Sequence, residues 1–208
     1  MFIEAVPEQT RQNLAVLAQA GVSQPFYLAG GTAVAFHLGH RISVDLDFFG
    51  PEPFDPEDLA GHLTDAGRFR LDSFAPDTLL GFFEGVRISF FRYRYPSVDG
   101  LVTVLDTSVA GIGDLAAMKV EAIGQRGFRR DFIDLYFLCQ LRMTLAEALA
   151  WHQRKFADLN VNVVHLIKSL SYFEDAEADP MPQMLKPVSW AEVRRFFERE
   201  AELLFRHL

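Results

Sequence analysis

The chain has 208 residues, of which half are hydrophobic and 23% are charged. This composition is typical of a globular protein with a sizeable core and excludes a disordered chain. The 28 acidic residues outnumber the 20 basic residues and give a net charge of −8. The charge argues against a protein that coats nucleic acid through its overall field, although it is compatible with a local basic patch.

The single cysteine, Cys139, cannot form an internal disulfide, which favours a reducing compartment. The N-terminal residues lack the basic and apolar segments of a signal peptide. No run of the sequence approaches the roughly 20 apolar residues of a membrane span. We therefore expect a cytoplasmic protein that makes no membrane contact.

The first half of the chain mixes helical and strand patterns. The predicted helices are 8–20, 32–38 and 56–66, and the predicted strands are 26–29, 44–49, 69–74, 78–83, 86–91 and 101–105. Gly30 and Gly31 are expected to end the first strand before the second helix. Gly85, with Glu84 beside it, predicts a hairpin between the fourth and fifth strands.

The second half of the chain is helical in pattern. The predicted helices are 114–125, with Asp114 as its cap, then 131–141, 162–173, and two that begin with capping boxes at Thr144 and Ser189, the last ending at 207. Four acids and three prolines predict a loop over 174–187. The expected fold is α+β: a mixed sheet with helices over 1–112, followed by a helical bundle over 113–208 that packs on it, as a second domain or within one continuous domain.

Asp45 and Asp47 are the first candidate residues for a functional site. Residues two apart on a strand share a face, so both carboxylates point the same way, with their backbones about 6.6 Å apart. Two such anions repel each other unless a cation or abundant water separates them. Magnesium is commonly held by one or two carboxylates together with substrate phosphates. The pair therefore predicts a Mg²⁺ (or Mn²⁺) site. The alternative, without a functional role, is a solvated strand edge.

The glycine pair and Thr32 supply the other half of such a site. Without Cβ atoms, the backbone at Gly30 and Gly31 can approach a ligand closely. A helix that begins near Thr32 directs free N–H groups and a partial positive charge at an anion. The Thr32 hydroxyl would bind a phosphate or cap the helix. Alone, a Gly-Gly turn is usually structural, but its spacing from the two aspartates favours a combined phosphate and metal site.

The stretches LAGGTAVAFHLGHRISVDLDFF and DLAAMKVEAIGQRGFRRDFIDLYFL carry a family resemblance. Both resemble the AbiEii/AbiGii toxin family of nucleotidyltransferases, within the polymerase-beta-like superfamily. The resemblance runs through most of the chain and is most specific in the first stretch. It implies a nucleotidyltransferase fold, a divalent metal and transfer of a nucleotide from an NTP. Some members of the family are toxins that modify RNA and are paired with an antitoxin.

The helical block adds candidates for this site. Lys119 and Arg126 share a helix face, as do Asp131 and Asp134. Read alone, these charges would form local ion pairs on a solvated helical hairpin, with Asp131 as a helix cap. With the first motif, Lys119 is expected to contact a triphosphate, and Arg126 and Arg130 to bind phosphate or hold the acids.

The resemblance supports Lys119, Asp131 and Asp134 as site residues. Two roles are open for Asp134, which would act as a general base or orient Lys119. His37 and His40 lie three apart and are expected to be structural or to contact phosphate, because a histidine pair without further partners is weak evidence for a metal.

A third carboxylate is missing from the expected place. The superfamily supplies one from a later strand, and two-metal transfer uses carboxylates that bridge ions about 4 Å apart. In the strand 86–91 the corresponding face carries Arg87, Ser89 and Phe91. The absence puts two-metal catalysis in question.

The expected function is transfer of a nucleotide from an NTP to a hydroxyl acceptor. Asp45, Asp47, Lys119 and Asp134 are the catalytic candidates, and Gly30, Gly31, Thr32, Lys119, Arg126 and Arg130 are the nucleotide-binding candidates. An RNA such as tRNA, a protein or a small molecule is the expected acceptor, and a cognate antitoxin is a further expected partner. The alternatives are a nucleotide-binding module with little or no catalysis and an interaction protein whose aspartates are surface charge.

Overall fold

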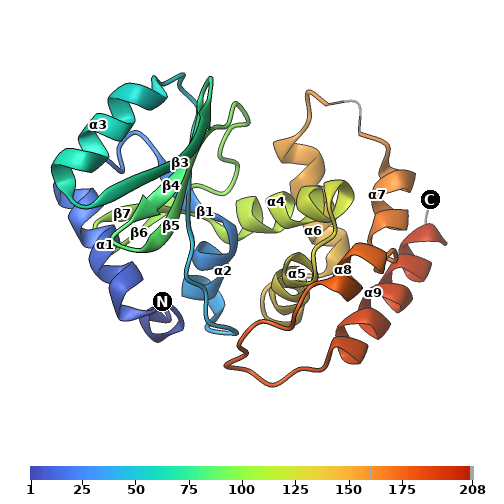
Figure 1. Cartoon of the computed structure of the whole chain (residues 1–208). Coiled ribbons are helices and arrows are strands. Elements are labelled where there is room, and N and C mark those ends of the chain that lie inside the picture. Colours follow the sequence, from blue (N-terminus) through green and yellow to red (C-terminus); the bar gives the residue numbers. More distant parts are fainter. Residues whose placement is uncertain (160, 207–208) are drawn as a thin grey trace.

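The computed structural model describes residues 1–159 and 161–206 and divides into a sheet-containing half and a helical half (Figure 1). The strands are β1 (Tyr27–Ala29), β2 (Leu46–Gly50), β3 (Phe69–Ala75), β4 (Thr78–Phe83), β5 (Val86–Arg92), β6 (Leu101–Val104) and β7 (Thr107–Ala110). The helices of the first half are the 3₁₀ turn η1 (Ile3–Ala5), α1 (Glu8–Gln19), α2 (Gly30–Leu38) and α3 (Pro56–Ala66). Those of the second half are α4 (Ile112–Gln125), α5 (Arg129–Leu141), α6 (Leu145–Lys155), α7 (Val163–Ser169), α8 (Glu174–Ala178) and α9 (Trp190–Phe205).

The seven strands of the described residues form one mixed sheet in the order β3-β4-β5-β2-β1-β7-β6. β2 lies at its centre, antiparallel to β1 and parallel to β5. In this register Asp47 is paired with Ala29 on one side and with Ser89 on the other. The sheet therefore brings the end of the first strand, the second aspartate and the fifth strand together. The predicted α+β fold is confirmed.

Alternation along β2 explains how the sheet presents its polar side chains. Leu46 and Phe48 are fully buried, whereas Asp47 and Phe49 are only partly buried. Phe48 stacks on Phe90 of β5 with the ring centroids 4.8 Å apart. One face of the central strands is thus fixed in an aromatic core, and the opposite face is left for the cavity described below.

Local signals place several elements as predicted. The β4–β5 hairpin turns through Glu84 and Gly85, both with positive φ, as a tight two-residue turn requires. Thr144 and Ser189 each form the predicted capping box, with Glu147 and Glu192 respectively. These turns and caps are local, which is why the sequence reveals them.

Some predicted boundaries are wrong. Gly30 and Gly31 form the first turn of α2 and do not separate strand from helix. Strand β7 was not predicted, because the turn that precedes it, with Leu105 and Asp106 at positive φ, contains neither glycine nor proline. Helix α8 lies in the predicted loop, and Arg129 donates to the carbonyl of its Ala176.

Two further differences concern helix ends. α7 ends at Ser169 and not at 173. α4 begins at Ile112, so Asp114 lies in its first turn, where the carboxylate accepts a hydrogen bond from Lys155 at 2.6 Å. Residue 207, the predicted end of the last helix, lies outside the described residues. Among the described helices, no helix combines the length and apolarity needed to cross a bilayer.

Candidate active site

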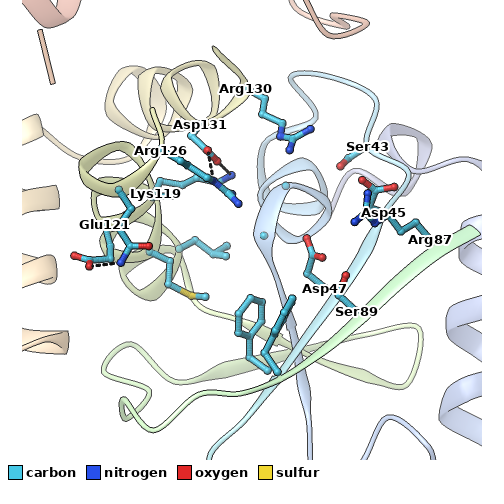
Figure 2. Close-up of a pocket in the computed structure, with 18 of the residues that line it drawn as sticks. Ser43, Asp45, Asp47, Arg87, Ser89, Lys119, Glu121, Arg126, Arg130 and Asp131 are labelled. Carbon is cyan, nitrogen blue, oxygen red and sulfur yellow. Dashed lines mark hydrogen bonds and ion pairs between the residues drawn. The ribbon is translucent and has the colours of Figure 1, made fainter. Parts of the chain in front are cut away.

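A cavity of about 770 Å³ lies between the central strands and helix α4. Figure 2 shows Asp47 and Ser89 on the sheet side, and Lys119, Glu121, Arg126 and Asp131 on the facing helices. Among the residues predicted for the site, those that line the cavity are Gly30, Gly31, Asp45, Asp47, Lys119, Arg126, Arg130 and Asp131. Segments more than 80 residues apart in the chain therefore face one space.

The two aspartates lie on the sheet side of the cavity (Figure 2). Asp45 comes just before β2, and Asp47 is the second residue of that strand. Burial raises the pKa of Asp47, the nearby Ser89 hydroxyl lowers it, and the Asp45 carboxylate raises it again, with a net increase. The increase means that the ionised form of Asp47 is disfavoured. A cation placed between the two carboxylates would relieve this cost.

The glycines make room for two charged groups. Gly30 has a φ of +67°, and a Cβ atom there would lie 2.6 Å from Oδ2 of Asp47. A Cβ atom on Gly31 would overlap Nη2 of Arg41. The absence of side chains thus allows Asp47 and Arg41 to lie against the N-terminus of α2, whose free N–H groups favour anions.

Thr32 has a different place from the one predicted. Its hydroxyl donates a hydrogen bond to the backbone carbonyl of Asp45 and lies 3.0 Å from the Ser43 hydroxyl. It is buried, does not line the cavity, and does not cap α2, whose N-cap residue is Ala29. The side chain holds the segment that carries Asp45 and does not point at a ligand.

A network of ion pairs joins α4 to α5, and one member of it joins α5 to the sheet half. Lys119 Nζ lies 2.7 Å from Asp131 and 2.7 Å from Asp134. Arg126 Nε lies 3.2 Å from Asp131. Arg41 donates to Asp134 from Nε at 2.7 Å and from Nη2 at 3.0 Å. The predicted local pairing is therefore present, with both aspartates buried, and Arg41 extends it to the sheet half.

The charges in this network are held in their ionised forms. Burial alone would raise the pKa of Asp134, but Arg41 and Lys119 outweigh it and hold that pKa well below its usual value. Burial likewise opposes ionisation of Asp131, and Lys119 and Arg126 hold its pKa below the usual value. Asp131 does not cap α5, whose N-cap residue is Phe128.

Asp134 is fully buried and does not line the cavity. A general base must reach the proton that it abstracts. The geometry therefore favours the second of the two predicted roles, orientation of Lys119. Arg41 shares this carboxylate, so Asp134 positions two cations at once.

Arg130, His37 and His40 are the remaining candidate residues, and each contacts another group of the protein. Arg130 is exposed on the rim and lies over the Phe128 ring at 5.2 Å. His37 Nε2 lies 2.9 Å from the carbonyl of Ala110, and His40 Nε2 lies 2.8 Å from Asp134. The two histidines thus bind protein groups, as the structural interpretation of this pair expects.

The acidic side chains of the cavity determine which metal it could hold. No group of three or more His, Cys, Asp or Glu side chains suited to a metal is present in the described part of the chain. Asp45 and Asp47 supply two carboxylates, which fits Mg²⁺ where substrate phosphates and water complete the octahedron. Ser89 lies opposite Asp47 in the strand register, where a third carboxylate would be expected.

Comparison with known proteins identifies the family. The family described as "Nucleotidyl transferase AbiEii toxin, Type IV TA system" matches residues 14–108, which include β1, α2, β2 and β5. The chain belongs to this family. The predicted resemblance to AbiEii nucleotidyltransferases is therefore confirmed, and with it the enzyme class.

One relative and two solved structures of similar fold match nearly the whole chain. The uncharacterized protein aq_aa25 of Aquifex aeolicus (strain VF5) is 36% identical over 200 residues, covering 94% of this chain and 95% of that protein. A structure from H. pylori, provisionally described as a nucleotidyltransferase, has a TM-score of 0.57 at 17% identity and covers 97% of each chain. The nucleotidyltransferase toxin MenT4 of Mycobacterium tuberculosis H37Rv has a TM-score of 0.56 at 16% identity, covering 96% of this chain and 86% of that one.

This AbiEii-family nucleotidyltransferase also has cavity residues that the sequence did not single out for the site. Phe49 and Tyr93 form an aromatic end, with ring centroids 5.2 Å apart, and Met118 and Glu121 face it from α4. Phe49 follows Asp47 by two residues, so strand alternation is a signal that could have found it. Glu121 reaches the cavity only through the packing of α4, for which the sequence offers no signal.

Proposed function

We propose that the protein transfers a nucleotide from an NTP to a hydroxyl acceptor and that the reaction depends on Mg²⁺. The observation that carries this proposal is the convergence of Asp45 and Asp47 with the glycine turn of α2 and with Lys119 on one cavity. Asp45 and Asp47 would hold the metal, which supplies charge neutralisation at the α-phosphate. The first turn of α2 would bind the other phosphates through its N–H groups.

Lys119 has the role of a fixed cation in this proposal. Burial disfavours its charge, but Asp131 and Asp134 more than compensate and raise its pKa, so the ammonium group stays protonated. Its place on the cavity wall would let it balance the charge that develops on the leaving pyrophosphate. Arg126 and Arg130 would contribute at the rim. Such catalysis is mainly positioning and electrostatic stabilisation.

The acceptor that we propose is an RNA, with tRNA as the first substrate to test. The chain is acidic overall, yet basic residues gather on the cavity. They are Arg41, Arg87, Arg92, Lys119, Arg126 and Arg130. A local basic wall of this kind suits a phosphate backbone. We further propose that the protein acts in the cytoplasm as the toxin of a toxin–antitoxin pair, as the family description indicates.

The test is transfer of label from each α-labelled NTP, with magnesium, to total cell RNA or to protein. Wild-type protein should label RNA, and Asp45→Asn and Asp47→Asn should not. Glu52→Gln, an exposed change outside the cavity, is the matched control and should keep full activity. Label transfer that survives both aspartate changes would contradict the proposed site.

A second candidate function is nucleotide binding with little or no turnover. The position of Ser89 opposite Asp47 favours it, because a third carboxylate is missing there. This function predicts magnesium-dependent NTP binding without pyrophosphate release in the presence of RNA. It also predicts that Ser89→Asp increases the affinity for magnesium, because that change adds a carboxylate beside Asp47.

A further inference from the structure

The cavity has two chemically different ends. One end carries Asp45, Asp47 and Lys119, and the other carries the aromatic rings of Phe49 and Tyr93. Phe49 follows Asp47 by two residues on the same face of β2, a separation of about 6.6 Å. A nucleotide whose phosphates lie at the charged end would extend its ribose along β2 and place its base at the aromatic end.

The aromatic end is suited to hold a flat ring. Phe49 and Tyr93 meet edge to face, and Tyr93 packs in the same way on Tyr95. Met118, on α4, lines the opposite wall. Aromatic side chains hold nucleobases by stacking, whichever base is present. Stacking alone would therefore bind all NTPs with similar affinity, and a polar group is needed for selection.

Glu121 lies on the helix side of the cavity (Figure 2), and its negative charge contributes to the raised pKa of Tyr93, which places it near the aromatic end. Its Oε1 accepts a hydrogen bond from Gln125 Nε2 at 2.8 Å, and its Oε2 lies 2.7 Å from His152 Nε2. The bond to His152, which outweighs partial burial, keeps the pKa of Glu121 below its usual value. The carboxylate is thus fixed, ionised and able to accept further hydrogen bonds, but it has no proton to donate.

From this geometry we propose that Glu121 selects the base of the NTP by accepting a hydrogen bond from an amino group on it. The inference rests on the proposed function, because it takes the cavity as the NTP site. Adenine, cytosine and guanine carry an amino group, whereas uracil and hypoxanthine carry none. Glu121 is partly exposed to the cavity, so a base that covers it without donating a hydrogen bond removes water from the carboxylate and replaces it with nothing. Nucleotides without the amino group therefore bind more weakly.

The test is equilibrium binding with Mg²⁺ of nucleotide pairs that differ at the amino position. CTP is compared with UTP, and ATP and GTP with ITP, each as an α,β-methylene analogue that blocks transfer. In at least one pair, wild-type protein should bind the amino-bearing nucleotide about tenfold more tightly. Glu121→Gln should reduce that difference to less than about twofold. Glu52→Gln should leave it unchanged.

Inorganic tripolyphosphate separates this inference from the proposed function and also checks folding. Its Mg²⁺-dependent affinity should be the same for wild type and Glu121→Gln, because it reaches only the charged end. Equal affinities within every pair for the wild type would overturn the inference alone. So would a Glu121→Gln protein that binds tripolyphosphate normally and keeps the wild-type difference, or one that loses all ligands equally. A wild type that binds neither NTP nor tripolyphosphate would overturn the proposed function, and the inference with it.

Discussion

A Cβ atom on Gly30 would lie 2.6 Å from Oδ2 of Asp47, so the glycine leaves the space that this carboxylate occupies. The φ of +67° at Gly30 adds a second constraint, because L side chains rarely adopt it. At Gly30, where β1 meets α2, both the contact with Asp47 and the backbone conformation exclude a side chain. The exclusion places a carboxylate directly against a helix N-terminus.

Gly30→Ala is expected to lower nucleotide transfer by at least about 100-fold, because a shift of about 1 Å at a reacting centre has that effect. Backbone strain should also lower the free energy of unfolding by about 1–3 kcal/mol. The matched control is Gly61→Ala in α3, where a Cβ atom meets nothing within 4 Å. That change should preserve activity and slightly increase stability. Equal activity of the two variants would contradict the account.

Asp47→Asn is expected to stabilise the metal-free protein while it abolishes transfer. Burial and the neighbouring Asp45 raise the pKa of Asp47, so its charge opposes folding at neutral pH. Asp47 is partly exposed to the cavity, so removal of the charge should add at most about 1 kcal/mol, a rise in Tm of roughly 2–4 °C. Thermal melts with EDTA and with excess Mg²⁺ test this. A lower Tm of the variant in EDTA would show that the charge of Asp47 does not destabilise the folded protein.

Asp134→Asn is expected to lower the free energy of unfolding by about 3–5 kcal/mol, because the buried Arg41 loses its ion-pair partner and Lys119 keeps only Asp131. Denaturant unfolding measures the change. Glu202→Gln removes the partner of an exposed Arg206 on α9 and should change stability little. Any folded Asp134→Asn protein should keep the wild-type pH profile for transfer, because Asp134 positions cations and moves no proton. Loss of the acidic limb of that profile, which is the fall in rate as a general base becomes protonated, would identify Asp134 as the base.

Folding stability and Mg²⁺-dependent NTP binding should be lost at different pH values. The pKa values of Asp131 and Asp134 are lowered in the folded protein, so their contribution is complete above the unfolded value and is lost as the pH falls below about 4. The pKa of Asp47 is raised instead, so this metal-binding carboxylate becomes protonated at a higher pH than Asp131 and Asp134. Mg²⁺-dependent NTP binding should therefore weaken at a higher pH than the one at which the protein unfolds. Coincidence of the two transitions would contradict this assignment.

Binding of the proposed substrate should stabilise the folded protein. At 100 times its dissociation constant, a ligand adds about 2.7 kcal/mol, which corresponds to a rise in Tm of roughly 5–10 °C for a chain of this size. The rise should need NTP and Mg²⁺ together, and it should disappear in Asp47→Asn. If neither NTP nor Mg²⁺ changes the Tm, the aspartates are surface charge and the chain acts through other partners.

The sequence predicts those parts of the fold that depend on local chemistry. Alternation along β2 predicts that Asp45 and Asp47 face away from Leu46 and Phe48, and strand alternation likewise predicts Ser89 on the face opposite to the core. The role of Thr32 was not predictable, because its partner is the backbone of a segment that only the folded chain brings near. Arg41 and Asp134 lie 93 residues apart, so their ion pair depends on the packing of α5 against the sheet half. Helical spacing gives the shared face of Asp131 and Asp134, but not which of them lines the cavity.

The most direct measurement is a crystal structure with Mg²⁺ and an α,β-methylene NTP. We expect a metal about 2.0–2.1 Å from carboxylate oxygens of Asp45 and Asp47 and in contact with the triphosphate. We also expect phosphate oxygens within hydrogen-bonding distance of Lys119 and of the first turn of α2. A triphosphate bound outside this cavity, or a metal that touches neither aspartate, would contradict the account.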